Sequence, residues 1–299
     1  LDPLKELPEQ PLTFDINDEN LEIFIHFQNG KYNFIGQKGD TYPQQKPLND
    51  NAISISMDAQ MLLNGISRSL FATADDELRP VMNGVYFDIH TDDLTFVASD
   101  GHKLVRLRNL AVKSPERASF ILPKKPANLL KNLLAKESEQ VLIKFDDNNA
   151  YITCTNFEMV CRLIEGRYPN YNSVIPQENP FKVTIDRISF LNALKRVSVF
   201  SNPASSLVKL HLKDSLITVS AQDIDFSTSA EERIVCQFDG TELSIGFKAT
   251  YLIEILGNIS SEEVVLELAD PSRAGLIVPS ENDEDEDLLM LLMPMMLND

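Results

Sequence analysis

The tripeptide Asp100–Gly101–His102 contains the residue types in this sequence that could most readily carry out acid–base chemistry. An aspartate two residues from a histidine can orient an imidazole for proton transfer. However, the sequence has no nucleophile elbow, phosphate-binding glycine loop or metal-ligand spacing to accompany it. A glycine between two polar residues is typical of a turn. We therefore interpret His102 as a turn histidine and predict that the protein is not an enzyme.

Cysteine chemistry is also unpromising. Cys154, Cys161 and Cys236 are odd in number and form no C-x-x-C pair. This pattern favours neither a disulfide framework nor a metal site, and it predicts a reducing, cytoplasmic setting without cofactors. The most apolar stretch, Leu288–Leu297, is shorter than the ~18 residues that a membrane span needs. We therefore expect no membrane association.

The charge balance is strongly acidic. The 299 residues carry a formal net charge of −18. Binding DNA by phosphate neutralisation needs a basic face, so this balance argues against a protein that grips DNA tightly. The distribution of the few cations therefore matters more than their number.

An internal repeat organises the chain. Ser56–Thr73 aligns without gaps on Thr184–Ser201 at an offset of 128 (186 − 58). Ser138–Phe145 aligns on Ser261–Leu268 at an offset of 123 (261 − 138). Each repeat therefore predicts a helix, several short strands, a second helix and further strands.

This pattern predicts an α+β fold of repeated domains with antiparallel sheets and two helices per domain. Residues 1–50 are interpreted as the C-terminal part of a first domain whose N-terminal part is absent from this sequence. Residues 51–180 form the middle domain and residues 181–299 the C-terminal domain. Helices are expected at 58–71, 123–136, 186–200 and 250–258.

Cations gather on the polar faces of three of these helices. The helix over 123–136 should bury Leu129, Leu130, Leu133 and Leu134 and expose its lysines. The candidate basic surface comprises Arg68, Lys124, Lys125, Lys131, Lys195 and Arg196. These positions are also compatible with ordinary solvated helix faces.

Three segments resemble bacterial DNA sliding clamps, the beta subunits of DNA polymerase III. They are RPVMNGVYFDIHTDDLTFVASDGHKL at Arg79–Leu104, EGRYPNY at Glu165–Tyr171 and LLMLLMPMML at Leu288–Leu297. The corresponding family patterns are A-T-D-G-H-R-L, D-G-R-F-P-D-Y and a terminal V-M-P-M-R-L. The resemblance covers the whole chain in order.

This resemblance implies a ring of repeated DNA-clamp domains. Such clamps are head-to-tail homodimers whose helices face a central channel and whose sheets lie outside. The ring encircles duplex DNA without regard to sequence and tethers the DNA polymerase III catalytic subunit. A topological link needs only a weakly basic channel, so the acidic remainder can face outward.

The family also has a hydrophobic pocket for short peptides between its middle and last domains. The clamp loader and other DNA polymerases and repair proteins carrying a clamp-binding motif dock there. The implied pocket residues are Met82, Ser99, Gly101, His102, Lys103, Leu104, Pro169, Ser173, Val174, Lys248, Tyr251, Leu291, Leu292, Met293, Pro294, Met295 and Met296. The implied dimer contacts are Leu4, Leu7, Val199 and Phe200.

Three features depart from the family pattern. Met296 stands where the family has arginine, and Ser205 stands where it often has an aromatic residue. The acidic segment Glu281–Asp287 has no family counterpart and is expected to be disordered. A repeat-built protein-interaction scaffold that never encircles DNA remains an alternative, and the terminal hydrophobic run could equally be a buried edge strand.

Overall fold

The computed structural model describes residues 2–42 and 47–297. The chain divides into two compact units at Pro47. Among the described residues, no helix is long and apolar enough to span a membrane.

The first unit is a three-stranded antiparallel sheet in the order β1–β2–β3. Its elements are α1 (Asp2–Lys5), β1 (Thr13–Ile16), β2 (Glu22–Phe27), β3 (Gly30–Ile35) and the 3-10 helix η1 (Gly39–Thr41). β3 is an edge strand on which Phe34 is 46% and Ile35 is 75% exposed. This unit therefore presents apolar surface and an unpaired strand edge within its described residues.

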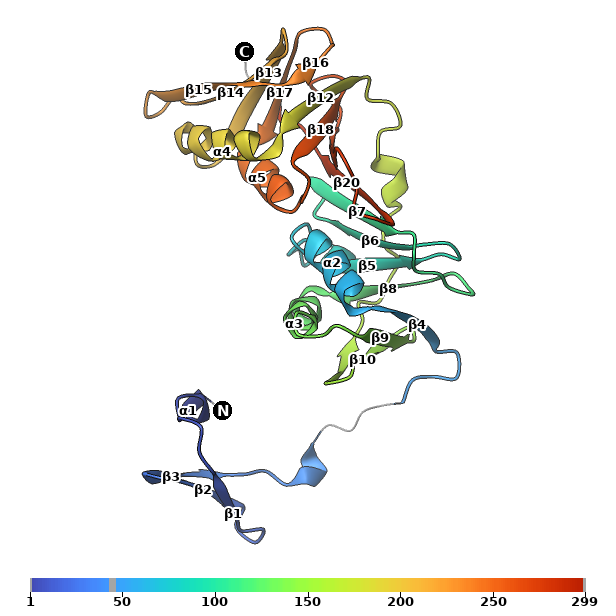
Figure 1. Cartoon of the computed structure of the whole chain (residues 1–299), viewed down its shortest axis with the longest axis vertical. Helices are drawn as coiled ribbons and strands as arrows, with labels where there is room; N and C mark the ends of the chain where they lie inside the picture. The colour runs from blue at the N-terminus through green and yellow to red at the C-terminus, as the bar shows by residue number, and fades with distance from the viewer. Residues whose placement is uncertain (1, 43–46, 298–299) are drawn as a thin grey trace. The chain divides into compact units, whose positions relative to one another are not determined.

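The second unit contains both copies of the repeat (Figure 1). The first copy comprises β4 (Ile53–Asp58), α2 (Ala59–Leu70), η2 (Pro80–Met82), β5 (Gly84–Ile89), β6 (Leu94–Ser99), β7 (Lys103–Asn109), β8 (Ala118–Pro123), α3 (Lys124–Leu134), β9 (Gln140–Phe145), β10 (Asn149–Thr153) and β11 (Glu158–Arg162). A linker with the 3-10 helix η3 (Tyr171–Val174) follows.

The second copy comprises β12 (Phe181–Asp186), α4 (Arg187–Val197), η4 (Ser198–Phe200), β13 (Leu207–Lys213), β14 (Leu216–Asp223), β15 (Thr228–Val235), β16 (Gln237–Phe238), β17 (Leu243–Lys248), α5 (Ala249–Gly257), β18 (Glu263–Leu268), β19 (Gly275–Pro279) and β20 (Glu286–Leu292). Apart from the short β16, it follows the order of the first copy. The predicted α+β repeat is confirmed.

Matching helix starts explain why the two copies begin alike. The Asp58 side chain accepts a hydrogen bond from the Gln60 backbone N–H at the start of α2. Asp186, 128 residues later, accepts from the Ser189 N–H at the start of α4. Each aspartate satisfies a backbone donor that the first helical turn leaves unpaired.

The two copies share one sheet. Its nine strands run β16–β12–β18–β19–β20–β7–β6–β5–β8, so β20 of the last domain pairs antiparallel with β7 of the middle domain. The ladder extends from Glu286 opposite Asn109 to Leu292 opposite Lys103. The two four-stranded sheets are β11–β10–β9–β4 and β15–β14–β13–β17. The helix pairs α2/α3 and α4/α5 lie on the same side of the nine-stranded sheet (Figure 1).

One hydrophobic core runs through both domains, and a second cluster lies under the linker. The second cluster includes Leu104, Tyr168, Tyr171, Ile175 and Leu291. Alternation along a strand explains the separation, because consecutive side chains point to opposite faces of the nine-stranded sheet. The linker therefore covers the face of the junction opposite to the main core.

The predicted buried stripe of α3 holds at Leu130 and Leu134, but Leu133 is only half-buried. Leu129 is 52% exposed, whereas Ala127, Leu130 and Leu134 are buried. These three follow the spacing of one helix face, and Leu129 falls on its neighbour. Leu129 therefore adds exposed apolar surface to the face that carries the lysines.

Close packing at Gly65 gives a stability prediction. A Cβ at this α2 position would lie 2.4 Å from ring carbons of Phe96, which is fully buried. We expect Gly65→Ala to destabilise the protein by about 1–3 kcal/mol through overpacking, although alanine is the better helix former. Gly257→Ala in α5 is the matched control, since nothing lies within 4 Å of its added Cβ. Urea unfolding that shows equal stability for both variants would contradict this packing argument.

Candidate partner-docking site

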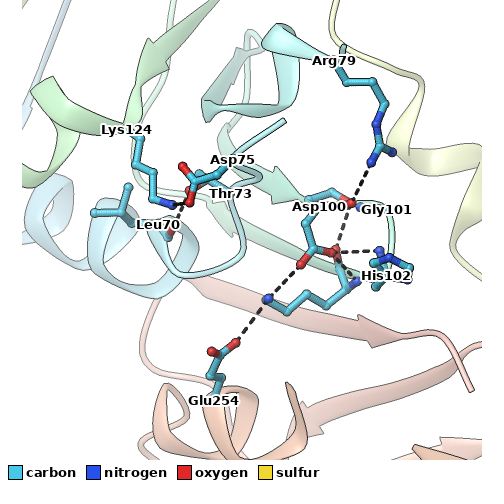
Figure 2. Close-up of polar contacts among 11 residues, drawn as sticks. Leu70, Thr73, Asp75, Arg79, Asp100, Gly101, His102, Lys124 and Glu254 are labelled. Atoms are coloured by element: carbon cyan, nitrogen blue, oxygen red, sulfur yellow. Dashed lines mark hydrogen bonds and ion pairs between the residues drawn. The ribbon is translucent and has the colours of Figure 1, made fainter. Parts of the chain in front are cut away.

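The turn between β6 and β7 forms a rigid corner (Figure 2). The Asp100 carboxylate accepts hydrogen bonds from the backbone N–H groups of His102 (2.8 Å) and Lys103 (2.9 Å) and from Lys103 Nζ (2.8 Å). Gly101 has a φ of +91°, and an added Cβ would lie 2.7 Å from an Arg79 nitrogen. Asp100 therefore stabilises the turn by binding backbone donors. Its carboxylate binds these donors and Lys103, and not the His102 imidazole.

Lys103 joins this corner to the last domain. Its side chain is 6% exposed, and Nζ lies 3.2 Å from a carboxylate oxygen of Glu254 on α5. Nζ also sits 4.1 Å from the centre of the Tyr251 ring, while Lys248 Nζ lies 4.8 Å from it. The His102 ring stacks on Tyr251 at 6.1 Å. Two ammonium groups and an imidazole thus fix a half-buried aromatic ring at the domain junction.

Asp100 and Lys103 each stabilise the charged form of the other. Burial alone raises the pKa of Asp100, but hydrogen bonds from Lys103 and the turn outweigh it, so the pKa lies below its ordinary value. Burial lowers the pKa of Lys103, but Asp100 and Glu254 outweigh it, so this pKa is raised. Both groups are therefore charged at neutral pH.

Acid should weaken the corner in a defined direction. A carboxylate with a depressed folded pKa contributes stability above its unfolded pKa of about 4 and loses it as the pH falls through the folded value. We expect Asp100→Asn to lower the free energy of unfolding by about 2 kcal/mol at pH 7. The difference from the parent protein should shrink below pH 4 in urea unfolding series. A constant difference from pH 7 to pH 3 would contradict this role of Asp100, and Asp147→Asn in an exposed turn is the control.

The three cysteines lie apart from this corner. Burial raises the pKa of the Cys154 and Cys161 thiols to about 11 and raises that of Cys236 as well. Thiols of this kind are protonated at neutral pH and are poor nucleophiles. All three are free.

The tail after β20 lies against the corner and then against β17. The Met293 N–H donates to the His102 carbonyl at 2.9 Å, and the Met295 N–H donates to the Gly246 carbonyl at 2.8 Å. Met293 is 43% and Met296 is 80% exposed. The tail is thus fixed through its backbone while its flexible thioether side chains face outward, which suits adaptable binding.

The seventeen predicted pocket residues differ in how far they are exposed to solvent. Met82, Ser99, Lys103, Leu104, Leu291 and Leu292 are buried. The outward positions are Gly101, His102, Pro169, Ser173, Val174, Met293 and Met296, and the half-buried ones are Lys248, Tyr251, Pro294 and Met295. The buried members can only support a binding surface from beneath.

The strand ladder further divides these residues between two faces. Leu104 and Leu291 pair across the junction within the cluster under the linker. Leu292 belongs to the main core on the other face. The terminal run is therefore neither an edge strand nor confined to its own domain, because β20 is a central strand that joins two domains.

A groove of about 650 Å³ beside the tail was not predicted from the sequence. Its lining includes Ser205, Leu207, Ile224 and Leu297. Ser205, where the resemblance led us to expect an aromatic residue, is part of this lining. Polar and charged residues, among them Lys209, Asp225 and Glu231, complete the lining, so the groove beside the tail is of mixed character.

Family models match nearly all of the second unit. The model for the central domain of the DNA polymerase III beta subunit matches residues 56–170, and the model for its C-terminal domain matches residues 172–296. The chain belongs to the DNA polymerase III beta subunit family.

Known sliding clamps agree in sequence and fold. The beta sliding clamp of Pseudomonas aeruginosa is 27% identical over 298 residues, which cover 99% of this chain and 80% of that protein. The beta sliding clamp of Staphylococcus aureus is 27% identical over 97% of this chain and 77% of its own length. A crystal structure of the Pseudomonas aeruginosa sliding clamp bound to griselimycin superposes with a TM-score of 0.91 at 26% identity, covering 99% of this chain and 79% of that one.

The predicted channel cations on the helices differ in whether an ion pair already binds them. Lys125, Lys131 and Lys195 are exposed, and no ion pair links them to another described residue. Lys124 pairs with Asp75 at 2.5 Å (Figure 2). Arg196 binds both carboxylate oxygens of Glu232, at 2.8 and 2.6 Å.

Arg68 is the most buried of the six predicted channel cations. Its side chain is only 12% exposed and pairs with Asp283 and Glu286. A guanidinium held by two carboxylates is not available to phosphates, so we remove Arg68 from the proposed channel surface. The expectation that Glu281–Asp287 is disordered is wrong, because side chains of the middle domain hold this segment at the start of β20.

Proposed function

We propose that this protein acts as a DNA sliding clamp that encircles duplex DNA, sequence-independently, and tethers polymerases to it. The observation that supports this most is the β7–β20 junction, which joins two repeated domains edge to edge. The helix pairs of both domains lie on the same side of the shared sheet (Figure 1). Repeating such a junction head to tail gives a closed ring with helices facing inward.

The charge distribution supports sliding rather than gripping. Lys125, Lys131 and Lys195 lie on the helices, whereas the whole chain has a net charge of −18. A few cations facing DNA attract the duplex weakly, and an acidic exterior discourages binding elsewhere. No cofactor or catalytic residue is needed for this role, and we expect it to be carried out in the cytoplasm.

Partners would dock at the outward and half-buried residues around the tail. His102, Lys248, Tyr251, Met293 and Met296 offer an aromatic ring, aliphatic thioethers and two basic side chains. A short linear peptide with leucine and phenylalanine anchors fits such a surface. We propose the DNA polymerase III catalytic subunit, the clamp loader, other DNA polymerases and repair proteins as partners.

Homodimer formation would use two unpaired strand edges. β15 ends the sheet β15–β14–β13–β17 and β3 ends the sheet of the first unit. Because β15 follows α4 as β7 follows α2, pairing β15 with β3 of a second copy would reproduce the β7–β20 junction. Exposed Val199 and Phe200 lie near α4, and half-buried Leu4 and Leu7 would face them from the partner.

A single charge at this edge should test the dimer. We expect Val199→Asp, at a side chain 78% exposed, to convert the protein from dimer to monomer in light scattering at micromolar concentration, because it would bury an unpaired carboxylate. Leu78→Asp, at a middle-domain side chain 91% exposed, is the matched control. A dimer that persists in Val199→Asp as in Leu78→Asp would refute this interface.

Primer extension on a long single-primed template tests the proposed function. With the clamp loader, ATP and the replicative polymerase present, the protein should lengthen the products made in one binding event. An interaction scaffold that does not encircle DNA would bind the polymerase yet leave product length unchanged.

A further inference from the structure

The acidic segment before β20 is held by the middle domain. Glu286 is 7% exposed, and its carboxylate lies 2.9 Å from Arg68 Nη1 on α2. Asn64, one helical turn earlier, donates to the same carboxylate at 3.2 Å. Arg68 also pairs with Asp283 and donates to Ser260 Oγ at 3.1 Å. One helix face thus binds two carboxylates of another domain.

Strand β7 binds the same segment from its other side. Asp287 lies 2.8 Å from Arg106 and 3.6 Å from Arg108. The Leu110 N–H donates to the Asp285 carbonyl at 2.8 Å. The segment is therefore attached to the middle domain at points on both α2 and the end of β7.

The ion pairs across this junction all have one polarity. Among the described residues, each ion pair joins a cation of the middle domain to a carboxylate of the last domain. The four cations are Arg68, Arg106, Arg108 and Lys103, and Lys103 pairs with Glu254. Charge-assisted hydrogen bonds at partly buried positions are worth more than exposed pairs. Arg68–Glu286, whose side chains are 12% and 7% exposed, is therefore expected to be the strongest of these pairs.

We propose that residues 283–287 form an ionic clasp that fixes the angle between the two complete domains. A strand pair alone sets register and spacing, but the twist between neighbouring strands varies by tens of degrees. The shared core and the cluster under the linker also join the two domains, and the attachment from α2 to the loop before β20 adds a polar restraint on rotation between them. The clasp would make Arg68 a residue that positions the last domain relative to the middle domain, and this role does not depend on DNA.

The repeat itself supplies the matched control. Arg196 occupies the position in α4 that Arg68 occupies in α2, at the same offset of 128 (196 − 68). Its side chain is 61% exposed and pairs with Glu232 inside the same domain. Arg196→Gln thus removes an equivalent arginine without touching the domain junction.

Hydrogen exchange measured by mass spectrometry on the full chain tests whether the clasp closes. We expect Arg68→Gln to speed exchange of the Leu110 and Glu286 amides at least tenfold, and Asp283→Asn, at a half-exposed side chain, to do so more weakly. Sodium chloride at 1 M should speed the same amides less than Arg68→Gln does, since partly buried pairs are screened only weakly. Arg196→Gln should leave them unchanged.

Spin-label distances test whether the clasp fixes the angle. Labels at Asn132→Cys on α3 and Asn192→Cys on α4, with the native cysteines replaced by alanine and diluted with unlabelled protein, report on the two domains. The distance distribution should broaden in Arg68→Gln and stay narrow in Arg196→Gln. Equal widths in both variants, or unchanged exchange in both Arg68→Gln and Asp283→Asn, would overturn the proposal. Neither readout depends on DNA or on a partner peptide.

Discussion

Cutting the chain after Leu292 is expected to abolish saturable binding of a Gln-Leu-x-Leu-Phe peptide. The cut removes Met293 and Met295, whose backbone bonds to His102 and Gly246 hold the tail against the domain junction. It also removes the exposed thioethers of Met293 and Met296 while leaving β20 intact. Hot-spot anchors dominate peptide affinity, so the dissociation constant should rise at least tenfold or beyond detection in fluorescence anisotropy.

The matched control for this truncation removes only Asn298 and Asp299. It should bind the peptide as the full chain does, and both shortened proteins should unfold cooperatively in urea. Equal binding by the two truncations would place the peptide elsewhere on the protein. No binding by any of the three chains would refute the docking proposal itself.

Replacing the three available helix lysines is expected to have the other large effect. In Lys125→Ala/Lys131→Ala/Lys195→Ala, the surface proposed to face DNA loses charges that have no ion-pair partner among the described residues. Each lost phosphate contact should lower the salt dependence of DNA association by about 0.9 in the log–log slope. We expect markedly less loading at 150 mM salt and several-fold shorter primer-extension products.

Lysines on other surfaces provide the control for this variant. Lys113, Lys144 and Lys213 are exposed in a loop and on strands, so replacing them by alanine makes the same change in net charge. That control should keep loading and product length near those of the parent. If both triple variants lose activity equally, net charge and not the helix surface would be responsible.

Local patterns in the sequence were sufficient to predict the repeat. Asp58 and Asp186 mark a helix start at the same position in each copy of the repeat, and both cap their helices in the structure. Turn chemistry was equally informative, since Gly101 adopts the positive φ that the Asp-Gly-His turn requires. Signals of this kind act over a few residues, so they can be read without knowing the tertiary fold.

Contacts between distant segments were not predictable in this way. Arg68 is 218 positions from Glu286, and nothing near Arg68 in the sequence indicates that its charge is already bound. The same contact orders a segment whose composition alone suggested disorder. Likewise, the unbroken apolar run Leu288–Leu292 reflects burial on both faces of a central strand, which a sequence cannot distinguish from an edge strand without its partner β7.

Retention on circular DNA tests the proposed function most directly. The protein is loaded by the clamp loader and ATP onto a nicked plasmid, the complex is separated by gel filtration, and the plasmid is then cut once. A clamp that encircles DNA should elute with the circle and leave it after linearisation. Protein that stays bound to linear DNA, or never elutes with the circle, would contradict a topological link.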